Sequence, residues 1–118
     1  MDVLIVILAA NLLGALGQLT LKIGMGNVGQ VDTISVEKLV EMFTNPIIIA
    51  GLTVYVIGTV FWLMALSKKE LSYVYPFLAI TIILVMILSK FILHETIGMY
   101  RIAGIAVIIC GILLVSRS

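Results

Sequence analysis

Apolar residues form four long runs along the chain, and short polar stretches separate them. A helix needs about 20 mostly apolar residues to span a bilayer, and each run approaches that length. Membrane-spanning strands would alternate apolar and polar residues, whereas stretches such as Ile82–Leu88 are apolar throughout. The runs therefore predict four membrane-spanning helices, at approximately residues 3–22, 46–67, 72–93 and 99–116.

The segment between the first two runs has a different pattern. Within residues 33–43, apolar side chains recur at helical spacing from Val36 to Phe43, with charged residues between them. Thr33 or Ser35 can cap the start of such a helix. We therefore expect a short amphipathic helix at the membrane interface, with a loop packed over the bundle as the alternative.

The connections set the topology. The glycine-rich stretch Gly24–Gly29 predicts a flexible link after the first helix, and Pro46 suits the first turn of the second. The remaining connections are short, which makes neighbouring helices antiparallel. The predicted fold is thus an all-α integral membrane protein, with residues 1–118 as a single four-helix transmembrane domain. The first run lacks the positive start of a signal peptide, since Asp2 is its only early charge, so we expect a retained helix.

Composition narrows the function classes. Hydrophobic residues make up 63% of the chain and charged ones 11%, against about 25% charged residues in soluble domains. Cys110 is the single cysteine, so an intrachain disulfide is excluded and no metal or other cofactor is expected. The chain has no phosphate-binding loop and no nucleophile–base set, so we expect neither a nucleotide-driven pump nor an enzyme, and no nucleic-acid partner.

Lysine and arginine are almost evenly divided between the two ends of the predicted bundle. Lys68, Lys69 and Arg117 fall on the side of the termini, and the other four fall on the opposite side. Orientation usually follows an excess of these residues on the cytoplasmic side. Three arrangements stay open: a weakly biased single orientation, an antiparallel homodimer, or an oppositely oriented partner chain.

Polar side chains in the first predicted helix form the clearest candidate site. Asn11, Gly14, Gln18 and Lys22 follow one another at helical spacing and make one polar stripe with a glycine notch. Polar groups inside a membrane helix tend to face protein or a water-filled cavity. The stripe can form hydrogen bonds between helices or contact a substrate, and both interpretations stay open.

The third predicted helix supplies further candidates. Pro76, beside Tyr75, frees a backbone carbonyl or kinks the helix, and such breaks recur at transport sites. Lys90 lies on the same membrane side as Lys22, and the two either extend to the headgroups or hold an anion such as a lipid phosphate. Trp62, near the end of the second helix, belongs either to the interfacial aromatic belt, which we favour, or to the mouth of a cavity.

The fourth predicted helix carries two glycines on one face. Gly104 and Gly111 are seven residues apart, and small residues let helix backbones approach closely. We therefore predict a dimer contact here, with packing inside one subunit as the alternative. Four helices alone leave little room for a solute, so we expect a cavity shared by two subunits.

Several motifs occur in an order that resembles short members of the drug/metabolite transporter superfamily. The likeness covers nearly the whole chain. It rests on Gly17–Lys22, Phe61–Leu66, Leu71–Pro76, His94–Glu95 and Arg101–Ile112.

Two branches of that superfamily have four helices. The small multidrug resistance proteins are antiparallel dimers that exchange protons for cations, and they rely on a glutamate in helix one. The corresponding residues 12–15 include no acid, which argues against proton coupling here. The small EamA-like proteins include subunits proposed to flip aminoarabinose-linked undecaprenyl phosphate. This second branch resembles the chain more closely, at Gly17–Gln18, Tyr75–Pro76 and His94–Glu95.

The resemblance and the residues together lead to one expectation. We expect a multi-pass inner-membrane transporter or flippase that moves an amphipathic substrate, such as a phosphate-bearing lipid carrier. Its partners would be the lipid bilayer and either a second copy or a related chain, and transport would run downhill or be driven by the membrane potential. The alternatives are a multidrug-like exporter of cations or polar metabolites, and an accessory subunit of a larger membrane complex. The predicted substrate-binding set is Asn11, Gly14, Gln18, Lys22, Tyr75, Pro76 and Lys90.

Overall fold

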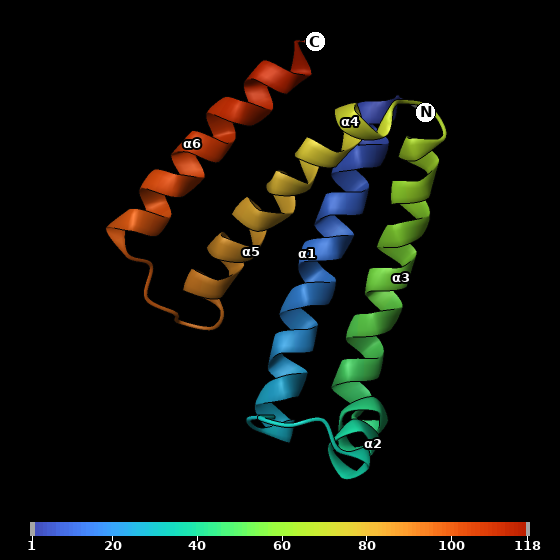
Figure 1. Ribbon diagram of the computed structural model, residues 1–118, viewed down its shortest axis with the longest axis vertical. Helices are drawn as coiled ribbons and strands as arrows, with labels where there is room; N and C mark the ends of the chain where they lie inside the picture. Colours follow the sequence, from blue (N-terminus) through green and yellow to red (C-terminus); the bar gives the residue numbers. More distant parts are fainter. Residues whose placement is uncertain (1, 118) are drawn as a thin grey trace.

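Four helical segments long and apolar enough to cross a membrane form an open bundle in the computed structural model, which describes residues 2–117 (Figure 1). No strand occurs within those residues. The all-α class and the four spans are thus confirmed. The four segments are α1 (Val3–Val28), α3 (Pro46–Leu66), the helical rod Leu71–Phe91 and α6 (Met99–Ser116).

The two ends of the bundle carry different parts of the chain. Asp2, the turn at residues 67–70 and Arg117 lie at one end, which we call the terminal side (Figure 1). Residues 29–35 and 92–98 lie at the opposite end, which we call the loop side. This division agrees with antiparallel packing of successive helices.

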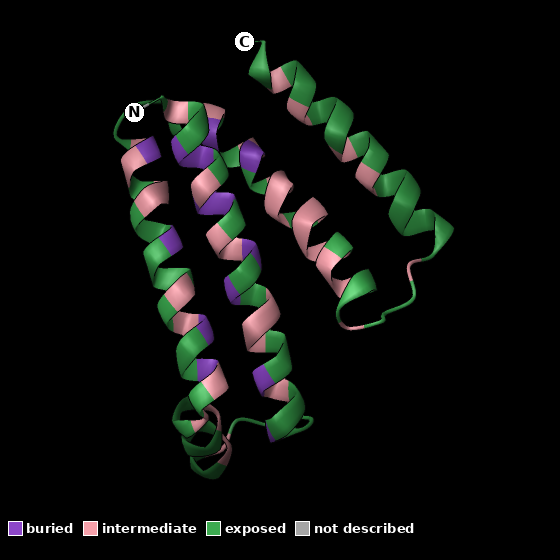
Figure 2. Cartoon of the chain, turned by 180° about the vertical axis from the view of Figure 1, so that it is seen from behind, coloured by how far each residue is buried: buried purple, intermediate pink, exposed green. Residues whose placement is uncertain are grey.

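Glycines bring α1 and α3 into close contact along their length. Gly17 and Gly24 on α1 face α3, and Gly51 and Gly58 on α3 face α1. A Cβ added to Gly17 would lie only 3.1 Å from the backbone nitrogen of Tyr55. Buried positions follow the facing sides of the two helices (Figure 2). We call these four glycines the glycine seam; in a membrane, such close backbone packing is a main source of helix association.

The first helix is longer than predicted. It continues to Val28, so the expectation that Gly24–Gly29 forms a flexible link is wrong. Gly24 is buried, and a Cβ there would lie 3.1 Å from the backbone nitrogen of Ile48. Packing against α3 therefore outweighs the low helix propensity of glycine. Gly29 caps the end of the helix, with a φ of +92°. Glycine adopts this backbone conformation without strain.

The predicted amphipathic helix is present as α2 (Val36–Thr44). The side chain of Ser35 accepts a hydrogen bond from the Lys38 backbone N–H over 3.2 Å, which confirms one of the two expected caps. Asn45 then caps α3, whose first residue is Pro46 as predicted. The chain thus passes from α2 on the loop side directly into the membrane-spanning helix α3.

The third membrane-spanning rod changes helix type at its proline. It consists of α4 (Leu71–Val74), the 3-10 helix η1 (Tyr75–Leu78) and α5 (Ala79–Phe91). Pro76 lies inside η1 and has no amide hydrogen to donate. The prediction that this proline disturbs the helix is confirmed. A short 3-10 stretch inside a longer helix often marks a hinge or a strained segment.

The apolar core lies on the terminal side. Its buried members come from α1, α3, α4 and η1, so these four elements are joined firmly at this end. Trp62 and Ile112 are among the half-buried residues packed against it. The buried core residues are Val6, Ile7, Ala65, Val74 and Phe77.

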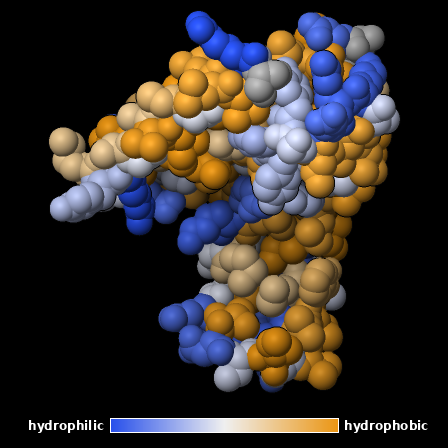
Figure 3. Space-filling model, turned by 45° about the horizontal axis from the view of Figure 1, so that its top comes forward, coloured by the Kyte–Doolittle hydropathy of each residue, from blue (hydrophilic) through white to orange (hydrophobic). Residues whose placement is uncertain are grey.

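α6 is the least packed of the four spans. None of its residues is buried, and it stands apart from α1 and α3 in both ribbon views (Figures 1 and 2). In the space-filling view, hydrophobic surface covers much of the molecule, and the surface is hollowed beside the α6 arm (Figure 3). Such apolar surface is compatible with a lipid environment rather than water.

Candidate functional site

A cavity of about 910 Å³ lies between α1, α3 and the η1–α5 part of the third rod. This volume is at the upper end of the range typical of small-molecule sites. No aspartate, glutamate, lysine, arginine or histidine lines it. The lining residues are Ala10, Asn11, Gly14, Gln18, Tyr55, Gly58, Thr59, Trp62, Tyr75, Pro76, Leu78, Ala79, Thr81, Ile82 and Val85.

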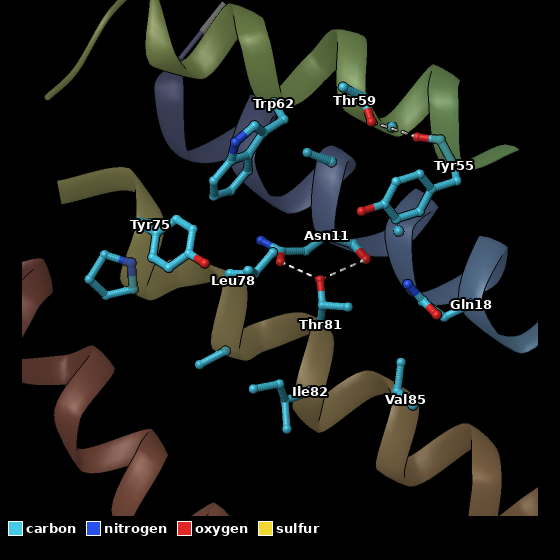
Figure 4. A pocket seen from close by; sticks show the side chains of 15 residues that line it. Asn11, Gln18, Tyr55, Thr59, Trp62, Tyr75, Leu78, Thr81, Ile82 and Val85 are labelled. Carbon is cyan, nitrogen blue, oxygen red and sulfur yellow. Dashed lines mark hydrogen bonds between the residues drawn. The ribbon is translucent and has the colours of Figure 1, made fainter. Parts of the chain in front are cut away.

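Helix periodicity places the α1 and α3 side chains in this cavity. Asn11 and Gln18 are seven residues apart on α1, and so share a face. Tyr55, Thr59 and Trp62 follow at spacings of four and three on α3, and face the same space (Figure 4). The glycine seam holds α1 and α3 close together, so these two rows lie side by side.

The hydroxyl of Thr81 joins α5 to α1 across the cavity wall. It lies 2.6 Å from Oδ1 of Asn11 and donates to it, and it lies 3.4 Å from the backbone oxygen of the same residue (Figure 4). The Asn11 amide donates in turn to the backbone oxygen of Ile7 over 2.9 Å. Asn11 is only 2% exposed, so its polar atoms need these partners. Asn11 thus forms a hydrogen bond between helices, which is the first of the two interpretations of the polar stripe.

Other polar groups of the cavity have no partner in the part of the chain that the structure describes. Within residues 2–117, no hydrogen bond involves the side chains of Gln18, Tyr55, Tyr75 or Trp62. Their amide, hydroxyl and indole groups face the cavity from three different elements (Figure 4). An uncharged polar molecule could therefore bond to several walls at once.

Aromatic rings form one end of the cavity. The rings of Trp62 and Tyr75 meet edge to face, with centroids 6.3 Å apart. Of the two interpretations of Trp62, the structure supports the cavity rather than the favoured belt, because its ring lines the cavity and packs against the core. Together with Tyr55, these rings offer flat apolar surface beside polar groups, a combination that suits an amphipathic ligand.

At the terminal side the cavity lies next to the apolar core, because Trp62 both lines the cavity and packs against that core. From there the lining extends toward the loop side as far as Gln18 and Val85. The site thus has one firmly packed end, as expected for a transport site that opens to one side at a time.

Five of the seven predicted substrate-binding residues line this one cavity. Gly14 is among them, and a Cβ there would make ordinary contact with Thr81 at 3.7 Å. Lys22 and Lys90 do not line it. Both are exposed toward the loop side, Lys22 one helical turn beyond Gln18.

The two glycines predicted to form a dimer contact have open space around them. A Cβ added to Gly104 or Gly111 would meet no atom within 4 Å. Gly104 lines a separate groove between α5 and α6, whereas Gly111 lines neither cavity nor groove. Their role in a dimer stays a prediction.

Sequence reasoning missed Tyr55, Thr59 and Thr81. Tyr55 and Thr59 carry a usable signal, since with Trp62 they form a polar and aromatic row on an otherwise apolar helix. Thr81 carries none, because a lone threonine in an apolar run usually bonds to its own helix. Residues 2–117 also contain no group of three histidine, cysteine, aspartate or glutamate side chains that could hold a metal ion.

The chain was compared with known proteins. The sequence profile of the EamA-like transporter family matches residues 5–117. A protein of Proteus mirabilis is 32% identical over 110 residues, covering 93% of each chain. A protein of Pseudomonas aeruginosa is 29% identical over 101 residues, covering 80% of this chain and 88% of its own. Both are named "Probable 4-amino-4-deoxy-L-arabinose-phosphoundecaprenol flippase subunit ArnE". No solved structure matches the chain.

Proposed function

Because this chain belongs to the EamA-like transporter family, we propose that it is a flippase subunit that moves the polar head of a lipid through the α1–α3–α5 cavity. It is a multi-pass protein of the inner membrane. The family and the names of its relatives indicate a transporter rather than an enzyme. Those relatives are named for a sugar-phosphate polyprenol, and we propose a lipid of the same class as the substrate.

The observation that carries the proposal is the set of unpartnered polar groups in an uncharged cavity. Gln18, Tyr55 and Tyr75 come from three elements and point into one space (Figure 4). All three side chains are exposed, so their polar groups are accessible to a ligand. Hydroxyls of a sugar head would satisfy these groups, and its apolar ring face would lie against Trp62.

The two lysines outside the cavity would act at an earlier step. Lys22 and Lys90 are exposed toward the loop side, where lipid phosphates lie. We propose that they attract the phosphate of the lipid there, while the head enters the cavity near Gln18. Long lysine side chains reach the headgroup level readily.

Moving the head to the other membrane surface requires the terminal side to open. The 3-10 helix at Pro76 lies next to the apolar core on that side and is the least regular part of the third rod. We propose that the rod bends here and that the hydrogen bond from Thr81 to Asn11 holds the closed state. No acidic group lines the cavity, so the movement would run downhill or follow the membrane potential.

A second subunit would complete the site. The cavity is bounded by α1, α3 and the third rod, and α6 adds no residue to its lining. We propose that a second copy or a related chain covers the open side. The predicted contact through Gly104 and Gly111 belongs to this proposal.

The test is a flipping assay in vesicles that contain the purified subunit, with its partner if one copurifies. The probe is a fluorescent sugar-phosphate polyprenyl lipid, and the readout is the rate at which it becomes accessible to an impermeant quencher. Gln18→Leu and Tyr55→Phe should each slow flipping about fivefold or more, since each removes a hydrogen bond worth about 1 kcal/mol or more.

The matched control is Thr20→Val. Thr20 lies on α1 and its hydroxyl bonds only to the Leu16 backbone oxygen, over 2.8 Å. This variant should flip the probe at the normal rate. Unchanged rates in Gln18→Leu and Tyr55→Phe would remove the cavity from the mechanism. If deletion of the chain still abolished flipping by its partner, the chain would be an accessory subunit.

A further inference from the structure

A second hollow, of about 350 Å³, lies between α5 and the first half of α6. Most of its lining is aliphatic and comes from the two facing helices, including Met86 on α5 and Ile108 on α6. At its loop-side end the lining becomes polar, with Ser89, Glu95 and Arg101. The groove is thus apolar along its length and charged at one end, which matches the outline of a lipid with an anionic head.

We propose that this groove binds the hydrocarbon chain of a single-chain lipid phosphate, with the phosphate at Arg101. The inference rests on the proposed function, since it assigns to the groove the chain and phosphate of the lipid whose head enters the cavity. It names a separate site, however, because Arg101 and Ser89 do not line the cavity.

The charged end favours an anion. Arg101 is exposed in the first turn of α6, and within residues 2–117 it forms no hydrogen bond through its side chain and no ion pair. Glu95 lines the same end but is not paired with it. Lys90 follows Ser89 in the last turn of α5 but does not line the groove. A free guanidinium fork binds phosphate oxygens in pairs, which an ammonium group cannot do.

The dimensions favour a single chain. From Ile82 to Ser89 the α5 wall rises by about 10 Å, at 1.5 Å per residue. One row of side chains from each helix forms the walls. A groove of this length, with a volume of about 350 Å³, takes part of one hydrocarbon chain rather than two.

The groove is continuous with the cavity. Ile82 and Val85 line both hollows, so the two meet at one edge of α5. A lipid with its phosphate at Arg101 can therefore place its chain on one side of this edge and its head on the other. This arrangement would hold the lipid on the loop side before its head crosses.

Gly104 has no side chain, so it leaves open space in the groove. Substitution at this position therefore tests whether the groove binds a lipid chain. A Cβ there would meet nothing within 4 Å, so a larger side chain can enter the groove without displacing α5. Ala106 lies on the same helix, is exposed, does not line the groove and points away from the face that Gly104 and Gly111 share. Gly104→Leu and Ala106→Leu therefore form a matched pair.

The experiment measures binding to the full-length protein in detergent by native mass spectrometry. The probes are a polyprenyl monophosphate, the corresponding uncharged polyprenol, and phosphatidylglycerol as a two-chain anion. Wild type should bind the monophosphate about tenfold more tightly than the polyprenol, the difference expected from one charge-assisted contact. Arg101→Gln should remove this preference and Arg101→Lys should keep part of it. Gly104→Leu should weaken binding of both polyprenyl probes, and Ala106→Leu should bind them as wild type does.

Three results would overturn the inference. Arg101→Gln could keep the preference for phosphate, or phosphatidylglycerol could compete equally with the monophosphate. Alternatively, Gly104→Leu could bind both polyprenyl probes as well as Ala106→Leu does, or could lose them only because its dimer dissociates. Gln18→Leu separates this inference from the proposed function. It should bind the monophosphate normally but flip the fluorescent lipid slowly, so normal flipping by this variant would refute the proposed function and leave the groove intact.

Discussion

The hydroxyl of Thr81 donates a hydrogen bond to Oδ1 of Asn11 across 2.6 Å. The two residues are 70 positions apart in the chain, and each lies near the middle of a membrane-spanning segment. Asn11 is buried and its amide is already bonded to its own helix. The contact therefore fixes how α5 sits on α1, and with it the width of the cavity between them.

Removing this hydroxyl should destabilise the protein measurably. Thr81→Val keeps the shape of the side chain but leaves the Asn11 oxygen buried without a donor. We expect a loss of about 1 kcal/mol in the free energy of unfolding, as for other hydrogen bonds between membrane helices. Denaturant titration in mixed micelles would measure it, and Thr81→Ser should restore most of the loss.

The control for this variant is Thr53→Val. Thr53 is exposed on α3, and its hydroxyl bonds only to the backbone oxygen of Ile49, over 2.9 Å. The same change of side chain should have little effect there. Equal losses of stability in the two variants would show that the bond to Asn11 contributes no more than a bond within one helix.

The glycine seam gives a second prediction. A Cβ at Gly17 would lie 3.1 Å from the backbone nitrogen of Tyr55 and 3.2 Å from the backbone oxygen of Gly51. Since backbone atoms cannot move aside easily, Gly17→Ala should lower the free energy of unfolding by about 1–3 kcal/mol. The measurement is the same titration in micelles.

Gly26→Ala is the matched control for Gly17→Ala. Gly26 belongs to the same helix, and a Cβ there would meet nothing within 4 Å. Alanine favours the helix over glycine by about 0.5–1 kcal/mol, so this variant should be slightly more stable than wild type. A stable Gly17→Ala protein would mean that α1 and α3 are further apart than described.

The glycines also show where sequence reasoning stops. Run length and periodicity predicted the spans and α2, because both depend on residues close in sequence. The helical state of Gly24 was not predictable, since it depends on packing against Ile48. The partnership of Thr81 with Asn11 has the same cause, because only the tertiary structure decides which faces meet.

For the site itself, the polar stripe of α1 was the informative signal. Asn11 and Gln18 stand out because polar side chains are rare in an apolar helix. Both line the cavity, but only Gln18 is left without an internal partner. Helical spacing could show that they share a face, and could not show which of them is already bonded.

A third prediction concerns energy coupling. No carboxylate, histidine or lysine lines the cavity, so no side chain there can exchange protons near neutral pH. Flipping by vesicles with the purified subunit should therefore be unaffected by a pH gradient of either direction. A rate that falls when the gradient is abolished would place a proton-binding group in the mechanism.

His94 offers an internal check on that result. It lies outside the cavity, and its φ of +58° is a conformation that asparagine tolerates well. His94→Asn should therefore fold normally and flip the probe at the wild-type rate. A pH response lost in this variant would identify the histidine as its source.

The last prediction concerns the position of α2 relative to the membrane. Val36 is 79% exposed, and Val40 and Phe43 are each 56% exposed, so nothing else in residues 2–117 covers the apolar side of this helix. An amphipathic helix with a free apolar face buries that face in the headgroup region of a bilayer. Spin labels at Val40→Cys and Lys38→Cys, each in a Cys110→Ser background, would measure the depth in vesicles, since the two positions lie on opposite sides of α2. The label at position 40 should be reached mainly by oxygen, which concentrates in lipid, and the label at position 38 mainly by a water-soluble nickel complex. Equal access of the nickel complex to both positions would place α2 in water, away from the interface.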